Sequence, residues 1–158
     1  MDKIAVLYSE HTQLVDAIKY NLSDYLVDYL TEVKDLQKYD WVICLKKEIP
    51  EGNVIACHHS LLPAFDCSEP EKEAILSGVK VTGITIYYPN IGKIIAQYPV
   101  FIKNDFHYDD LKQELTYLEQ TIFPLVLEKI LKNEAFEINE LINKKCNGGC
   151  GGCSSCSH

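Results

Sequence analysis

The sequence contains no arginine, so all fifteen basic side chains among its 158 residues are lysines. The guanidinium group is the usual side chain for gripping a phosphate or a carboxylate at two points. Without it, lysines, backbone N–H groups and helix N-termini are left for that task. The net charge of −8 argues against non-specific binding to nucleic acid or to an anionic membrane. We therefore expect no nucleic-acid partner and no membrane partner.

Long apolar runs are also missing. No stretch approaches the roughly 20 apolar residues that a membrane-spanning helix requires. The segment from Met1 to Tyr8 has an apolar run too short for a signal peptide and lacks a small-residue cleavage site. We therefore expect a cytoplasmic protein. A chain of 158 residues has the size of one domain, which buries roughly two thirds of its unfolded surface.

Short apolar runs alternate with helical patterns along residues 1–133, which predicts one α/β domain. A helix begins near Thr12, and the segment 25–33 fits either a continuation of this helix or a strand. Ser68 is a suitable N-cap for a second helix that ends before Gly78. The predicted strands lie at residues 3–8, 40–45, 53–59, 79–88 and 92–102.

Leucine and isoleucine at helical spacing predict a long amphipathic helix from Tyr108 to about Asn133. Pro124 lies inside this pattern and predicts a kink or a break, because proline removes a backbone donor and clashes with the preceding turn. A shorter acidic helix follows at residues 134–145. It leads into a tail of different composition.

Residues 146–158 are rich in cysteine and glycine and contain no other apolar side chain to bury. Thiolates at two- and three-residue gaps, with glycine between them, can wrap one metal ion or an iron–sulfur cluster. Disulfides are disfavoured, because the cytoplasm is reducing and such short loops would be strained. We predict a metal-binding tail, with zinc, copper(I) and an iron–sulfur cluster all open, and with a protein partner or metal acceptor. The predicted ligands are Cys146, Cys150, Cys153 and Cys156.

Three blocks follow one another in the middle of the chain: HHSLLPAF at 58–65, GVKVTG at 78–83 and GKIIAQ at 92–97. In order and spacing they resemble the folate-dependent formyltransferase family, most closely the glycinamide ribonucleotide formyltransferases of purine synthesis. The similarity covers residues 56–131. It implies a Rossmann-like α/β fold with a mostly parallel sheet and a ligand at the carboxyl ends of the strands. It also implies transfer of a formyl group from 10-formyltetrahydrofolate to a substrate amine.

In that family an asparagine amide and a histidine hold the tetrahedral oxyanion, and an aspartate orients the histidine. The resemblance places the family histidine at His58, but it places Ala56 at the asparagine position and Asn90 at the aspartate position. An asparagine cannot take a proton. Loss of one oxyanion donor costs on the order of 3 to 4 kcal/mol in kcat.

Two hypotheses follow from this incomplete set. The first is a degenerate family member without family catalysis, whose metal-bearing tail makes it a carrier, a sensor or an assembly partner. The alternative is an active enzyme that uses 10-formyltetrahydrofolate, with His58 as the acid and Asn90 as a hydrogen-bonding surrogate. Both loops that bind ligands in that family, the phosphate loop and the loop that holds the pterin, are reduced in this sequence. Residues 9–13 replace a glycine-rich phosphate loop, and only the short segment 46–53 joins the two central strands.

The other polar side chains near His58 are expected to play smaller parts. Adjacent residues of an extended segment point in opposite directions, so we do not expect His58 and His59 to face one substrate. Cys44 and Cys57 lie in strand-like runs and are expected to be small buried hydrophobic residues rather than metal ligands. Asp66 is expected to be solvated.

Overall fold

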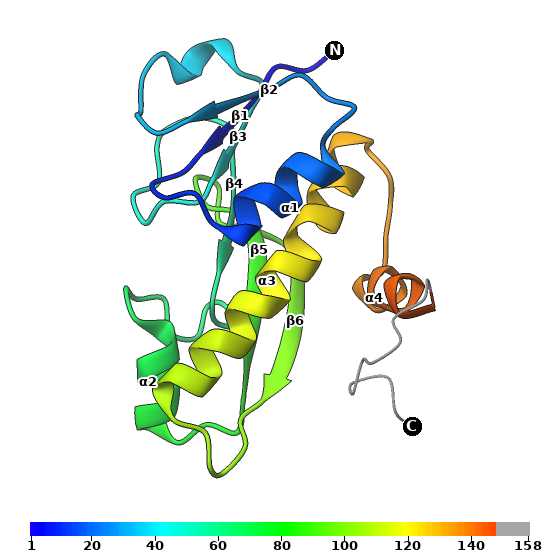
Figure 1. Ribbon diagram of the computed structural model, residues 1–158. Helices are drawn as coiled ribbons and strands as arrows, with labels where there is room; N and C mark the ends of the chain where they lie inside the picture. Colours follow the sequence, from blue (N-terminus) through cyan, green and yellow to red (C-terminus); the bar gives the residue numbers. More distant parts are fainter. Residues whose placement is uncertain (148–158) are drawn as a thin grey trace.

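A six-stranded sheet lies at the centre of the computed structural model, which describes residues 1–147, with side chains to residue 143 (Figure 1). The strand order is β2-β1-β3-β4-β5-β6. The first four strands pair in parallel, and β5 and β6 add an antiparallel hairpin. The strands are β1 (Ile4–Leu7), β2 (Val27–Leu30), β3 (Trp41–Cys44), β4 (Val54–His58), β5 (Val81–Tyr88) and β6 (Lys93–Phe101). The predicted α/β fold with a mostly parallel sheet is confirmed.

Helices α1 (Gln13–Asn21) and α3 (Tyr108–Leu131) cover one face of this sheet (Figure 1). The apolar side chains of both helices pack against alternate residues of the strands and form the main core. The opposite face carries a smaller cluster under the short 3-10 helix η1 (Leu36–Lys38). Because both faces of the central strands are covered, these strands read as continuous apolar runs in the sequence.

Two local features resolve or correct the sequence-based expectations. The ambiguous segment 25–33 contains strand β2, whose residues pair in parallel register with β1. Helix α2 (Pro70–Ser77) begins one residue later than predicted, with Glu69 rather than Ser68 as its N-cap. Proline is favoured at the first helical position, because its fixed φ suits a helix and its missing N–H would be unpaired there, so Pro70 sets this boundary.

The long helix α3 is not broken at Pro124 and continues to Leu131. An interior proline costs about 3 kcal/mol or more in an isolated helix. Here Phe123 and Leu127 are completely buried beside it. Core packing on this side therefore keeps the chain helical through the proline.

The hairpin of β5 and β6 anchors the loop that follows β4. The Thr85 hydroxyl donates to the carbonyl oxygen of Ser60 at 2.7 Å and accepts from the N–H of Leu62 at 3.0 Å. The Gln97 amide donates to the Leu62 carbonyl oxygen at 2.9 Å. A Cβ atom at Gly83 would lie 2.1 Å from a backbone oxygen of β6, so only glycine permits this close approach. The three sequence blocks thus meet in one structural unit.

Helix α4 (Ile138–Asn147) follows α3, and its apolar residues Ile138, Leu141 and Ile142 pack against the main core. Cys146 belongs to this helix, but its side chain lies outside the described residues. Cys150, Cys153 and Cys156 lie outside them entirely, so the metal-binding tail and the boundaries at 133 and 145 stay predictions. No helix in the described part of the chain is long and apolar enough to cross a membrane.

Candidate functional site

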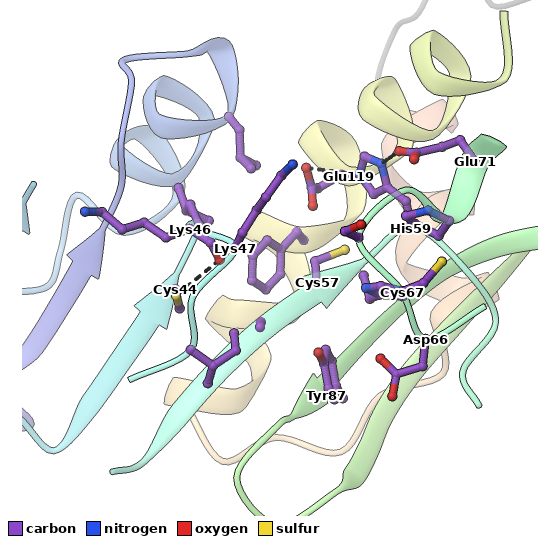
Figure 2. Close-up of a pocket in the computed structure, with 18 residues that line it drawn as sticks. Cys44, Lys46, Lys47, Cys57, His59, Asp66, Cys67, Glu71, Tyr87 and Glu119 are labelled. Carbon is purple, nitrogen blue, oxygen red and sulfur yellow. Dashed lines mark hydrogen bonds and ion pairs between the residues drawn. The ribbon is translucent and has the colours of Figure 1, made fainter. Parts of the chain in front are cut away.

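A cavity of about 490 Å³ opens at the carboxyl ends of β3 and β4 (Figure 2). Cavities of roughly 300 to 1,000 Å³ are typical of sites for small ligands, and open α/β sheets bind ligands at this edge. The loop after β3, the loop after β4, helix α2 and helix α3 all contribute to the wall. The charged and titratable groups that line it include Lys46, Lys47, His58, His59, Asp66, Glu71 and Glu119.

His58, the predicted catalytic histidine, lies at this cavity but is tied to its own loop. Its Nε2 atom is 3.0 Å from the carbonyl oxygen of Phe65. A carbonyl oxygen only accepts, so this nitrogen carries a hydrogen and donates it there. In the neutral ring, Nδ1 is then an acceptor. His58 therefore offers no N–H to a ligand unless the ring takes up a second proton.

Asn90, the predicted surrogate for the family aspartate, is not among the cavity-lining residues. Its side-chain amide donates to the carbonyl oxygens of Pro50 at 2.9 Å and Gly52 at 2.8 Å. Both amide hydrogens are thus used to hold the loop between β3 and β4. Ala56 does line the cavity and presents only a buried methyl group where the resemblance placed an amide.

His59 also lines the cavity, so the expectation that it faces away from the site of His58 was wrong. Strand β4 ends at His58, and the strict alternation of side chains ends with it. The Nδ1 atom of His59 lies 2.6 Å from Oε1 of Glu71, and its Nε2 atom lies 3.4 Å from Oε1 of Glu119 (Figure 2). No sequence spacing links these three residues, because they come from a loop, α2 and α3.

The two glutamates determine the protonation state of His59. Burial alone would lower its pKa, but the close carboxylate of Glu119 and the hydrogen-bonded carboxylate of Glu71 outweigh burial and raise the pKa to about 9. His59 is therefore an imidazolium at neutral pH. In turn, burial opposes ionisation of Glu71, while His59 and the more distant Lys112 lower the pKa of this carboxyl group.

Cys44 and Cys57, which line the cavity, are not activated nucleophiles. Burial, together with the neighbouring Glu119 carboxylate, raises the pKa of Cys57 well above its usual value. Burial also raises the pKa of Cys44. Both sulfurs are therefore thiols at neutral pH, as expected for small buried side chains. Within the described part of the chain, no group of three His, Cys, Asp or Glu side chains is placed to hold a metal ion.

Residues 44–127 match the formyl transferase family. The chain is 31% identical over 134 residues to a formyltetrahydrofolate deformylase of Escherichia coli (strain K12), an alignment covering 81% of this chain and 45% of that protein. It is 36% identical over 84 residues to the phosphoribosylglycinamide formyltransferase of Bacillus subtilis (strain 168), covering 51% and 43%. The crystal structure of a phosphoribosylglycinamide formyltransferase from Bacillus halodurans superposes with a TM-score of 0.66 and 23% identity, covering 82% of this chain and 95% of that one.

The fold and the site therefore define an α/β protein with a cavity at the carboxyl ends of β3 and β4. This chain belongs to the formyl transferase family, and the predicted family is confirmed. Phosphoribosylglycinamide formyltransferases are among both its sequence relatives and its structural neighbours. The chain spans less than half the length of the curated relatives that it matches.

Proposed function

We propose that this protein removes the formyl group from a formylated reduced folate, with water as the acceptor. Three features support the proposal: membership of the formyl transferase family, the cavity at the carboxyl end of β4, and the similarity to a formyltetrahydrofolate deformylase over 81% of the chain. The observation that carries it is the pair of His59 and Glu119 in the cavity wall. A proton donor and a proton acceptor stand side by side there, although positions 56 and 90 lack the family side chains.

Water is favoured over a phosphorylated amine as the acceptor. The chain has no arginine, and residues 9–13 contain no glycine to form a phosphate loop. Asp16 places a carboxylate in the first turn of α1, where it is paired with His11 at 2.7 Å. A carboxylate at this position already compensates the helix dipole that would otherwise attract a phosphate.

The test is to incubate the full-length protein with 10-formyltetrahydrofolate and to measure formate and tetrahydrofolate, with and without glycinamide ribonucleotide. We expect formate in a one-to-one ratio with tetrahydrofolate, at a rate that the amine does not change. Formylation of the amine without formate release would contradict the proposal. So would the absence of turnover under both conditions.

A second function is favoured by Ala56 and by the commitment of Asn90 to backbone carbonyls. In this alternative the chain is a degenerate family member that carries zinc or an iron–sulfur cluster on its tail and passes it to a protein partner. Metal and acid-labile sulfide, measured on protein purified without oxygen, would test it against a chain that ends at Lys145. Stoichiometric metal confined to the full-length chain supports this alternative. Metal-free full-length protein contradicts it.

A further inference from the structure

We propose that Glu119 and His59 are the proton acceptor and the proton donor of this cavity, in place of the role that the resemblance gives to His58. The inference rests on the proposed function and names the groups that perform it. Figure 2 shows the imidazole of His59 between the two glutamates at the cavity wall. The two contacts differ in length, at 2.6 Å to Glu71 and 3.4 Å to Glu119, so the two glutamates have different roles.

The short contact orients the ring. At 2.6 Å, the hydrogen bond from Nδ1 of His59 to Glu71 is charge-assisted and fixes the imidazole on helix α2. Glu71 is almost completely buried, at 7% exposure, so water competes little for this bond. Glu71 is therefore a positioning residue.

The long contact leaves a hydrogen available. The separation of 3.4 Å between Nε2 of His59 and Oε1 of Glu119 exceeds that of an ordinary N–H···O bond. A cavity ligand or a water molecule can therefore take the Nε2 hydrogen without displacing a tight partner. The carboxylate of Glu119 is a side chain of the same wall and can accept a proton from that water.

The charged groups facing His59 come from two helices. They are Glu71 on α2 and Glu119 on α3, while Lys112 on α3 acts on Glu71 and the Cys57 thiol on β4 acts on Glu119. The thiol stays protonated and adds no charge, so two carboxylates face one imidazolium. This arrangement keeps the donor charged at neutral pH.

The reaction balances with these two groups and water. A water oxygen attacks the formyl carbon while Glu119 takes one water proton. The C–N bond then breaks, its electron pair goes to the leaving nitrogen, and that nitrogen takes the Nε2 proton of His59. The products are formic acid and the deformylated amine. The proton on Glu119 returns to His59 and restores both groups.

Glu119→Gln and His59→Gln test the assignment in the full-length protein, with 10-formyltetrahydrofolate as substrate. General acid–base catalysis contributes about 100-fold or more, so each variant should lose about that factor in the rate of formate release. Folate binding, followed by fluorescence, should change only a few-fold. The double variant should be no slower than the slower single variant, because groups that act as a unit are not additive.

Matched controls exist on the same chain. Glu128→Gln removes a more exposed carboxylate from the same helix, and His11→Gln breaks an exposed histidine–aspartate pair. Both should keep the wild-type rate. Glu71→Gln keeps His59 but removes one of its carboxylates, so the alkaline limb of the pH–rate profile should move to lower pH. A merely structural role for Glu71 would not move that limb.

The possible failures can be told apart. Absence of formate release by the wild-type protein would overturn the proposed function and this inference with it. Formate release that survives in both Glu119→Gln and His59→Gln would overturn the inference alone. If His59→Gln fails to fold in a thermal melt, Glu119→Gln and the limb shift in Glu71→Gln decide the question, and an unchanged rate and profile would contradict the assignment.

Discussion

His58, the last residue of β4, and His59, the residue after it, both line the cavity but have different partners. His58 donates to the carbonyl oxygen of Phe65 and helps to close its own loop. His59 is paired with carboxylates of α2 and α3 and keeps a proton at neutral pH. His58 is thus bonded to a backbone carbonyl of its own loop, whereas His59 contacts two carboxylates from other elements. Two adjacent residues of one family motif therefore differ in their environment and charge.

Replacing His59 should have the largest effect on folding as well as on activity. His59→Gln leaves Glu71 and Glu119 facing each other without a cation. Breaking a buried ion pair costs about 3 kcal/mol or more, so we expect a loss of that order in the free energy of unfolding near pH 6. Urea denaturation measures it.

The sign of the pH dependence follows from the raised pKa of His59. A folded pKa of about 9, above the ordinary value of 6.5, gives a stability contribution that is complete below about pH 6.5. It is lost as the pH rises toward 9. The difference in unfolding free energy between wild type and His59→Gln should therefore shrink between pH 6 and pH 9.5. A difference that stays constant over this range would contradict the ion pairing.

A substitution at Gly83 should disrupt the packing of β5 against β6 and against the loop that contains Leu61. A Cβ atom there would meet the Tyr98 carbonyl oxygen at 2.1 Å and the Leu61 side chain at 2.7 Å. Overpacking of this kind costs typically about 1 to 3 kcal/mol, and the backbone contact places Gly83→Ala at the upper end. Gly52→Ala separates backbone strain from steric overlap, because Gly52 has a positive φ but no atom beyond its chain neighbours within 4 Å of the added Cβ. An unchanged melting temperature in Gly83→Ala would refute the close approach.

Removing the Thr85 hydroxyl should have a smaller effect on the same loop. Thr85→Val keeps the shape but leaves the Ser60 carbonyl and the Leu62 N–H without their partner. Unsatisfied buried groups cost about 1 to 3 kcal/mol, so we expect about 2 kcal/mol. Thr121→Val is the matched control, because the Thr121 hydroxyl bonds an exposed helical carbonyl of Tyr117. Equal losses in the two variants would show that Thr85 does not hold the loop.

Asn90→Asp should have the smallest effect on the free energy of unfolding. It also tests directly whether the region around His58 can perform formyl transfer. It restores the family residue type, but a carboxylate cannot donate to the carbonyls of Pro50 and Gly52. We expect a loss of about 1 kcal/mol in unfolding free energy and no gain in formyl transfer to an amine. A strong gain in transfer would return the chemistry to the region around His58. Asn90→Ala controls for the lost hydrogen bonds.

Much of the fold could be predicted from the sequence, because buried parallel strands appear as short apolar runs. Strand β2 could not be separated from a helix, since it has only four residues and none is fully buried. The position of the cavity was also predictable, since α/β folds bind ligands at the carboxyl ends of their strands.

The details of the site could not be predicted. Strand alternation places His59 away from His58, but β4 ends before His59 and the rule no longer applies. Its partners Glu71 and Glu119 lie 12 and 60 positions further along the chain, and only tertiary packing brings them together. The direction of the Asn90 amide is likewise set by a loop that is distant in sequence.

The most direct test compares formate release from 10-formyltetrahydrofolate by wild type, His58→Gln and His59→Gln at pH 7.5. We expect His59→Gln to lose about 100-fold in rate and His58→Gln to lose much less. The reverse order, with His58→Gln nearly inactive and His59→Gln close to wild type, would contradict this expectation.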